Sequence, residues 1–231
     1  MNRHENAAET AKWIALVAMV VDHAGHFFFP DLRVLRLIGR LSLPLFCWVI
    51  ALRLAEKPER ETGYLKRLTL WAVISQPLYW LGFHTLQPIY QVWNIMATLG
   101  LGVLLFAVVR RETWWRWPVV AALLPLGHWC SYGVMGAAMV PILALVAKDS
   151  VPHSALATGA AGSATSFFMS FYNLANYWGS PLAALASGTV AWLCLKLPVT
   201  VPRLPRWFFY AFYPLHIFVF IVVLVLLERL A

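Results

Sequence analysis

A series of apolar segments, most of them long enough to cross a lipid bilayer, is the feature that most constrains how this chain folds. Inside a bilayer the backbone N–H and C=O groups have to be satisfied within the segment itself, which favours helices. Composition agrees, because 61% of the 231 residues are hydrophobic and only 12% are charged. We therefore expect an all-α, polytopic integral membrane protein with about nine transmembrane helices in a single bundle, forming one domain over residues 1–231.

The expected spans differ in strength, and the fifth and sixth are the weakest. The fifth is short for a full crossing and contains Pro118 and Pro125, which favours a tilted, kinked or re-entrant segment. The nine expected spans are 12–29, 38–54, 67–83, 92–109, 117–129, 133–147, 154–172, 181–195 and 208–227.

The net charge of +8 reflects membrane topology rather than affinity for nucleic acid. Lysine and arginine collect in the cytoplasmic loops of membrane proteins. Most of the 18 lysines and arginines fall on one side when the N-terminus is placed in the cytoplasm. We therefore expect a cytoplasmic N-terminus, membrane lipids as partners and no nucleic-acid partner. The three cysteines lie in apolar stretches without metal-ligand spacing, so we expect them to pack in the core and expect no metal site.

Asp22 is the only acidic residue inside a membrane-length apolar segment, with His23 beside it and His26 one helical turn on. An ionisable side chain within a membrane span is costly and marks a functional site by default. A carboxylate can orient an imidazole and stabilise its protonated form, so we expect Asp22 and His23 to carry catalysis. The alternative role is a buried pair that links helices. His26 is a weaker candidate, which we assign to substrate binding.

Three arginines break the charge bias, at 33, 36 and 40, and they have helical spacing. They form either an anion-binding stripe, a partner for Asp22, or an interfacial row that reaches lipid headgroups. Function is favoured for Arg40, which we place among the catalytic candidates. Arg36 is a candidate for substrate binding.

The loop from residue 53 to 67 is strongly basic. Such a cluster usually reports only a cytoplasmic loop with affinity for anionic lipid, but it is also where a phosphate-rich cofactor would dock. The basic residues are Arg53, Lys57, Arg60, Lys66 and Arg67.

Polar side chains in later spans supply further candidates. Gln76 and Asn94 are amides in apolar surroundings, so they either bond between helices or line a substrate cavity. Tyr132 follows the fifth segment and is a further substrate-binding candidate. Tyr213 and His216 share a helix face beside Pro214, and His216 lies near the middle of the last span. Depth counted along the helices therefore allows the first and last spans to present polar groups to one buried site.

The chain resembles the TraX family, which is named for the F-pilin N-acetylase of conjugative plasmids. The resemblance covers most of the sequence, and the order and spacing of its motifs carry it. They are the run from Lys12 to His23, Leu37-Ile-Gly39-Arg40-Leu-Ser-Leu-Pro44-Leu-Phe46, Gly63-Tyr64-Leu-Lys66-Arg67-Leu, Ile74-Ser75-Gln76-Pro77, Asn94-Ile, Thr98-Leu-Gly100, Tyr132-Gly133 and Tyr213-Pro214-Leu-His216.

That family is similar to the transmembrane acyltransferases that O-acetylate surface polysaccharides. The resemblance implies a bacterial inner-membrane enzyme in which His23 is the base and Asp22 its orienter. It implies acetyl-CoA as acyl donor, with Lys66 and Arg67 on its phosphates, where the relatives have two spaced arginines. We add Tyr64 and Arg53 as further candidates for that cofactor site.

Two classes of function follow. The first is an acetyltransferase that acts on an amine or hydroxyl acceptor, either a pilin-like protein or a surface glycan, with Tyr213, His216 or Arg40 stabilising the oxyanion. The second is a proton-coupled transporter or flippase, which the same buried Asp and His residues would also serve. An assembly protein of a surface appendage is a third possibility, in which Asp22 and His23 are dispensable.

Overall fold

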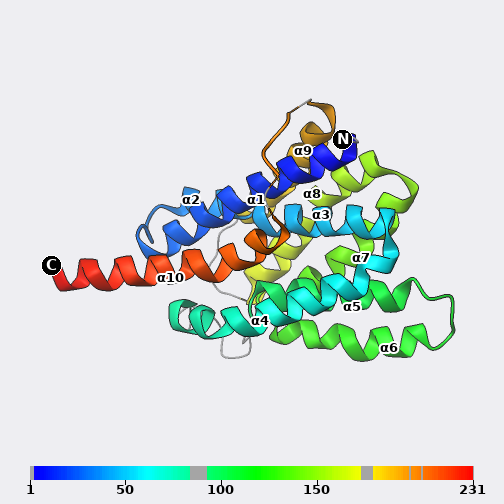
Figure 1. Cartoon of the computed structure of the whole chain (residues 1–231), viewed down its shortest axis with the longest axis horizontal. Helices are drawn as coiled ribbons and strands as arrows, with labels where there is room; N and C mark the ends of the chain where they lie inside the picture. Colours follow the sequence, from blue (N-terminus) through cyan, green and yellow to red (C-terminus); the bar gives the residue numbers. More distant parts are fainter. Residues whose placement is uncertain (1–2, 84–92, 173–178, 198, 204, 231) are drawn as a thin grey trace.

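The structure, a computed structural model, describes residues 3–83, 93–172, 179–197, 199–203 and 205–230. Within these ranges the chain is all-α, as expected, and extended pairing is limited to an isolated bridge between Trp93 and Cys130 (Figure 1). The helices are α1 (Arg3–Phe27), α2 (Arg33–Gly39), α3 (Ser42–Glu56), η1 (Pro58–Arg60), α4 (Glu61–Phe83), α5 (Ile95–Val109), α6 (Arg116–Leu123), η2 (Leu124–Trp129), α7 (Gly133–Asp149), α8 (Val151–Tyr172), α9 (Gly179–Lys196) and α10 (Arg206–Leu230).

Each expected span corresponds to helix, with two departures in the described residues. The segment expected over 38–54 is not one helix, because a turn at Arg40 and Leu41 separates α2 from α3. The expected fifth span is a short α-helix followed by the 3₁₀ helix η2, which has a proline in its first turn. Proline lacks the N–H that would continue the α-helical ladder, so the change in helix type follows from Pro125.

In the described part of the chain, two helical segments are long and apolar enough to cross a membrane by length and composition, Arg33–Glu56 and Trp207–Leu230, and Ile95–Val109 is a shorter apolar helix. The second segment has a mean hydropathy of 2.4 and is mostly exposed on the protein surface. Figure 1 shows α10 running between α1 and α4 and projecting past them at its C-terminal end.

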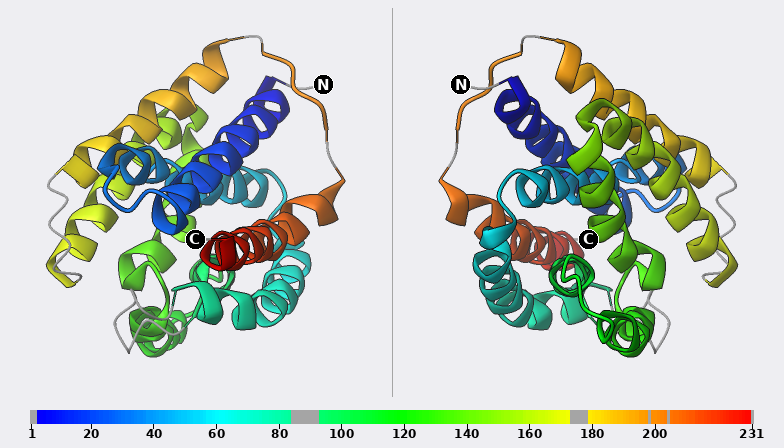
Figure 2. Two further views of the ribbon diagram at one scale, coloured as in Figure 1. Left: turned by 90° about the vertical axis from the view of Figure 1, so that its left-hand side faces the viewer. Right: turned by 90° about the vertical axis from the view of Figure 1, so that its right-hand side faces the viewer.

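The bundle has its tightest helix pair at one edge, where α8 and α9 lie side by side (Figure 2). Gly159 and Gly188 face each other there, and a Cβ added to Gly188 would lie 3.1 Å from the Gly159 Cα. Small residues at a helix interface let the two backbones approach closely. The central core is built on α3, whose Trp48 is fully buried and donates from Nε1 to Ser154 Oγ at 3.0 Å. All three cysteines are buried and unpaired, as expected.

Helix α2 folds back against α1 through glycines. A Cβ added to Gly39 would overlap the Oδ1, Cβ and Cγ atoms of Asp22, and a Cβ added to Gly25 would lie 2.7 Å from the Leu35 Cβ. Gly39 is therefore required by close approach of the α2 backbone to the Asp22 side chain, and this contact brings the arginines of α2 to the carboxylate.

Gly39→Ala is expected to lower thermal stability in detergent, because the new methyl group has to displace a buried side chain. Overpacking of this kind costs about 1–3 kcal/mol. Gly100→Ala is the matched control, since its Cβ would meet only the Leu68 Cβ at 3.6 Å, and a helical Gly→Ala change gains about 0.5–1 kcal/mol. Differential scanning fluorimetry compares the two melting temperatures. Equal effects would show that the contact between α2 and Asp22 is loose.

Candidate functional site

The first and last helices meet through two histidines. His23 Nδ1 on α1 lies 2.6 Å from His216 Nε2 on α10. The ring planes are within 7° of parallel with centroids 4.9 Å apart. Since the two nitrogens are much closer than the centroids, the rings meet edge to edge in a hydrogen bond. The structure therefore brings together the two histidines that depth along the helices had placed at one level.

The hydrogen-bond network assigns the tautomers of this pair. His216 Nδ1 lies 2.7 Å from the carbonyl oxygen of Phe212, which can only accept, so Nδ1 carries the hydrogen. In the neutral ring Nε2 is then an acceptor, and His23 Nδ1 has to donate to it. His23 is left with an unprotonated Nε2, which makes no hydrogen bond to the described residues. That nitrogen is available as a base.

Aromatic rings surround the pair. The ring of Phe83 lies 5.0 Å from the His23 ring, and the ring of Tyr213 lies 6.4 Å from it and 5.9 Å from that of His216. His26, expected to bind substrate, stacks on Phe83 at 4.7 Å, and its Nε2 lies 3.3 Å from the Gly82 carbonyl oxygen. His26 therefore braces α1 against α4.

Asp22 pairs with an arginine and not with His23. Its Oδ2 lies 3.1 Å from Arg36 Nη1, which also donates to the Asp22 backbone carbonyl at 3.2 Å. Arg40 interacts electrostatically with the same carboxylate, and its buried Nε and Asp22 Oδ1 have no hydrogen-bond partner among the described residues. The prediction that Asp22 orients His23 is wrong in this geometry, because neighbouring residues on a helix point about 100° apart. His216 holds His23 instead.

A cavity of about 350 Å³ leads toward the histidines between α1, α3, α4, α5 and α10. We call it the basic cavity. On α1 its lining runs along one helical face, from Glu5 through Glu9 and Lys12 to Met19. His23 continues this face one turn further, about 6 Å beyond Met19. Tyr213 lines the inner end of the cavity, so the cavity ends beside the histidine pair.

The mouth of the basic cavity carries more positive than negative charge. Its charged lining residues are Glu5, Glu9, Lys12, Arg53, Arg60, Arg67 and Arg203. Glu9 pairs with Lys12 at 2.7 Å and with Arg53 at 3.4 Å. Arg60 and Arg67 have no acidic partner among the residues that the structure describes. Two uncompensated guanidinium groups at a cavity mouth are suited to binding phosphate.

Arg67 is held in place by aromatic side chains. Its guanidinium lies 5.3 Å from the Tyr64 ring centroid and 5.9 Å from that of Tyr210, and its Nε donates to the Tyr210 hydroxyl at 3.5 Å. Cation–π contacts of this kind orient an arginine without neutralising it. Arg67 is therefore both fixed and charged.

Of the expected cofactor residues, Arg53, Tyr64 and Arg67 line the basic cavity, whereas Lys66 is exposed outside it. The reason is helical periodicity, because 64, 67 and 68 share one face of α4 and 66 does not. Arg110, the residue that follows α5, is not free to bind a cofactor phosphate because it pairs with Glu61. Its Nε and Nη2 bond to Glu61 at 2.6 and 2.8 Å, and this hydrogen bonding raises the pKa of Arg110.

Gln76 and Asn94, the expected substrate residues at α4 and at the start of α5, bond to each other, and Asn94 also bonds to backbone groups of both helices. Asn94 caps α5 by accepting from the N–H groups of Met96 and Ala97 at 3.0 and 3.4 Å. Its Nδ2 donates to the Gln76 side chain and to the Ala72 carbonyl, both at 2.8 Å. Asn94 is fully buried, and its pairing with Gln76 links helices, which is the first of the two roles expected for these amides.

Tyr132 lies at the N-cap of α7, outside the basic cavity. It interacts electrostatically with Asp22 and Arg40. It therefore belongs to the polar surroundings of the carboxylate.

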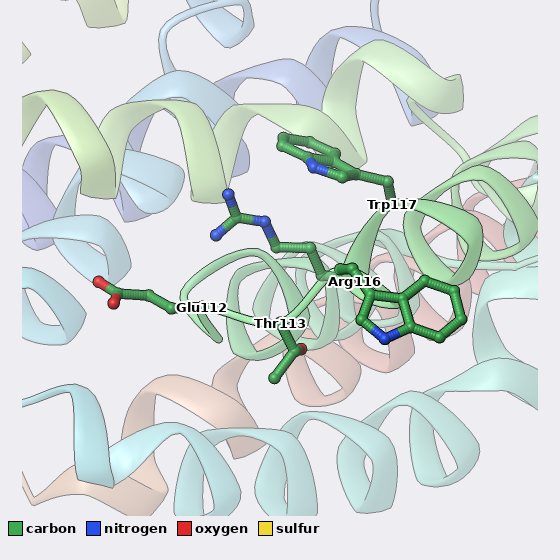
Figure 3. A pocket seen from close by; sticks show the side chains of 5 residues that line it. Glu112, Thr113, Arg116 and Trp117 are labelled. Atoms are coloured by element: carbon green, nitrogen blue, oxygen red, sulfur yellow. The ribbon is translucent and has the colours of Figure 1, made fainter.

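A second hollow lies on the surface at the start of α6. Glu112, Thr113, Trp114, Arg116 and Trp117 line it, and Figure 3 shows Arg116 extending beneath the Trp117 ring. The Arg116 guanidinium lies 4.8 Å from that ring, and the Trp114 side chain is strongly exposed. This lining contains no histidine. Exposed tryptophans beside arginine are typical of a membrane interface.

Sequence reasoning missed several residues of the basic cavity. Lys12 and Tyr210 were both within reach of it, since Lys12 shares a helical face with His23 and Tyr210 shares one with Tyr213. Arg203 carried no such signal, because it lies on the connection between α9 and α10.

Comparison with known proteins places these features in a family. A profile described as TraX protein matches residues 7–224. Protein TraX of Escherichia coli (strain K12) is 32% identical over 137 residues, which are 57% of this chain and 52% of that protein. The probable fimbrial assembly protein FimC, serogroup H1, of Dichelobacter nodosus is 29% identical over 146 residues, 58% of this chain and 59% of that protein. The chain thus spans little more than half the length of these two relatives. No solved structure matches it.

Arg36→Gln is expected to destabilise the protein, because it removes the cation that pairs with the buried Asp22 carboxylate. Leaving a buried polar group without its partner costs about 1–3 kcal/mol. Asp22→Asn combined with Arg36→Gln should recover most of that loss, since no charge is then left unpaired. Thermal melting of the wild type, the two single variants Arg36→Gln and Asp22→Asn, and the double variant measures the coupling between the two side chains. Additive losses would argue against the ion pair.

Proposed function

The chain belongs to the TraX protein family, and from this premise we propose that it is a multi-pass membrane acetyltransferase. It would transfer an acetyl group from acetyl-CoA to an amine or hydroxyl acceptor. The observation that carries the proposal is the unprotonated Nε2 of His23, whose ring lies 6.4 Å from Tyr213, a residue lining a cavity that also holds uncompensated arginines.

Membrane insertion is supported by the surface of the helices. On α10 the exposed large apolar residues include Leu215, Phe218, Val222 and Leu226. Apolar patches of this extent are rare on soluble monomers. All the basic residues at the cavity mouth belong to the set that a cytoplasmic N-terminus places inside. We propose the bacterial inner membrane, with the cavity mouth and the N-terminus facing the cytoplasm, where acetyl-CoA is made.

The basic cavity suits acetyl-CoA in the charge and polarity of its lining. Arg60 and Arg67 at the mouth match the phosphates, and apolar side chains such as Met19, Leu68 and Leu99 line the space that the pantetheine arm would follow. The thioester would then reach Tyr213 and His23. Bound there, the donor supplies an acetyl group activated by its thioester.

His23 would act as the general base. Its Nε2 removes a proton from the acceptor nitrogen or oxygen, which bonds to the acetyl carbon as the carbon–sulfur bond breaks. The same proton then passes from His23 to the departing thiolate, so His23 ends neutral and CoA leaves as a thiol. His216 orients the His23 ring, because its Nε2 accepts from His23 Nδ1 and leaves His23 Nε2 on the side of the ring away from His216.

Tyr213 is the best candidate to stabilise the oxyanion. It is buried and lines the cavity, and its ring lies 6.4 Å from that of His23. His216 is unsuited to this role because both of its ring nitrogens are already engaged. Arg40 interacts electrostatically with Asp22 and does not line the cavity.

The acceptor that we propose is a pilin-like protein, with a surface glycan as the second choice. The name of the Dichelobacter nodosus relative, a probable fimbrial assembly protein, supports the first choice.

His23→Ala is expected to lower acetyl transfer by at least about 10², the usual contribution of a positioned base. The protein in nanodiscs is given labelled acetyl-CoA and several acceptors, and transferred label is counted. Near-normal turnover by the folded variant would refute the role of His23.

The two variants of His216 separate positioning from packing. Glutamine offers an acceptor oxygen near the place of Nε2, so His216→Gln should retain clearly more activity than His216→Leu, with little change in the KM for acetyl-CoA. Equal loss in both would leave no positioning role for His216. If the wild type neither binds nor turns over acetyl-CoA but takes up a solute along a pH gradient, the transporter hypothesis replaces the enzyme.

A further inference from the structure

The rim of the basic cavity includes Arg203, which lies on the connection between α9 and α10. This connection runs past the N-terminal end of α1 (Figure 2). Trp13 Nε1 donates to the Pro202 carbonyl at 3.0 Å, and Arg203 Nη2 lies 2.9 Å from Glu5 Oε2. Arg203 is thus held at the cavity by α1.

Glu5 is shared between two arginines of the cavity. Its Oε1 lies 3.6 Å from Arg53 Nη1, while its Oε2 pairs with Arg203. The exposed fractions of the side chains are 53% for Arg203, 34% for Glu5 and 14% for Arg53. Arg203 is therefore the outer member of this group, and its guanidinium exchanges partners easily because an exposed ion pair is weak.

The covalent structure of the acyl donor determines which of its phosphate groups lies at each part of the cavity. Coenzyme A carries a diphosphate next to the pantetheine arm and a separate phosphate monoester on the ribose, at the end remote from the thioester. With the thioester beside Tyr213, the diphosphate lies nearer the interior than the ribose phosphate. Arg67, fixed by Tyr64 and Tyr210, suits the diphosphate. The exposed rim suits the ribose phosphate.

We propose that Arg203 binds the ribose 3′-phosphate of the donor and that Glu5 is its counter-ion when the cavity is free of donor. The inference rests on the proposed function and adds a specificity residue to it. Arg203 selects coenzyme A over its dephosphorylated form, because the monoester competes with Glu5 for the same guanidinium.

Binding of coenzyme A and of 3′-dephospho-coenzyme A to the full chain in nanodiscs tests the proposal. The wild type should prefer coenzyme A. Arg203→Gln should weaken coenzyme A binding by about threefold to tenfold, the range of an exposed charge pair with a doubly charged phosphate, and leave dephospho-coenzyme A within about twofold. Glu5→Gln should strengthen coenzyme A binding by about threefold, since a competing carboxylate is lost.

Arg3→Gln is the matched control. Arg3 contacts the C-terminal end of α9, just before the connection, donating to the carbonyls of Leu195 and Lys196 at 2.7 and 3.2 Å, but it does not line the cavity. Its loss should alter neither affinity. Arg203→Lys should keep the preference for coenzyme A.

The possible failures are distinguishable. If the wild type binds neither nucleotide, the proposed function fails and this inference with it. If the wild type binds both but Arg203→Gln changes both affinities equally, or neither, then the acyltransferase stands and the assignment of Arg203 is overturned. Equal weakening by Arg3→Gln would likewise reduce Arg203 to a structural role.

Discussion

Three ionisable side chains on α1 have to be satisfied inside an apolar bundle, and each of them finds its partner on a different helix. Asp22 is met by Arg36 of α2, His23 by His216 of α10, and His26 by the Gly82 carbonyl of α4. Unpaired polar groups in such surroundings cost several kcal/mol each. These polar contacts fix how α1 is positioned against α2, α10 and α4, which non-directional apolar packing alone would leave less defined.

The same helix also organises the candidate site. One face of α1 carries three charged residues of the cavity, Glu5, Glu9 and Lys12, and then Met19. His23 follows on the same face. Binding and chemistry are thereby set on one rigid element, with α10 supplying Tyr213 and His216 from the opposite side. The roles of the two histidines differ because of a single backbone carbonyl. Phe212 engages His216 Nδ1, and this contact leaves His23 with the free nitrogen.

Sequence reasoning succeeded where a residue's role depends on its own helix. Composition and periodicity predicted the helical segments. They also predicted that Tyr213 and His216 share a helix face and that the segment containing Arg53 and Arg67 is basic. It failed where the role depends on a partner elsewhere. Asp22 was assigned to His23, its neighbour in sequence, although the carboxylate turns toward Arg36. Pairing of Asp22 with one of the three arginines was offered only as one of several alternatives. Asn94 was a substrate candidate until its bonds to Gln76 and to the α5 backbone accounted for its polar atoms.

The sequence by itself determined an all-α fold, the family, and a polar stretch of the first helix that had to find partners. The fold and the polar stretch follow from hydropathy and the 3.6-residue period, which are local, whereas the family follows from the order and spacing of the motifs that resemble it. Only the tertiary structure decided that His216 holds His23, that Lys66 lies outside the cavity and that Arg203 lies at its rim. Those outcomes depend on which helix faces approach each other, and that is settled by steric fit, as where Gly39 admits the Asp22 side chain.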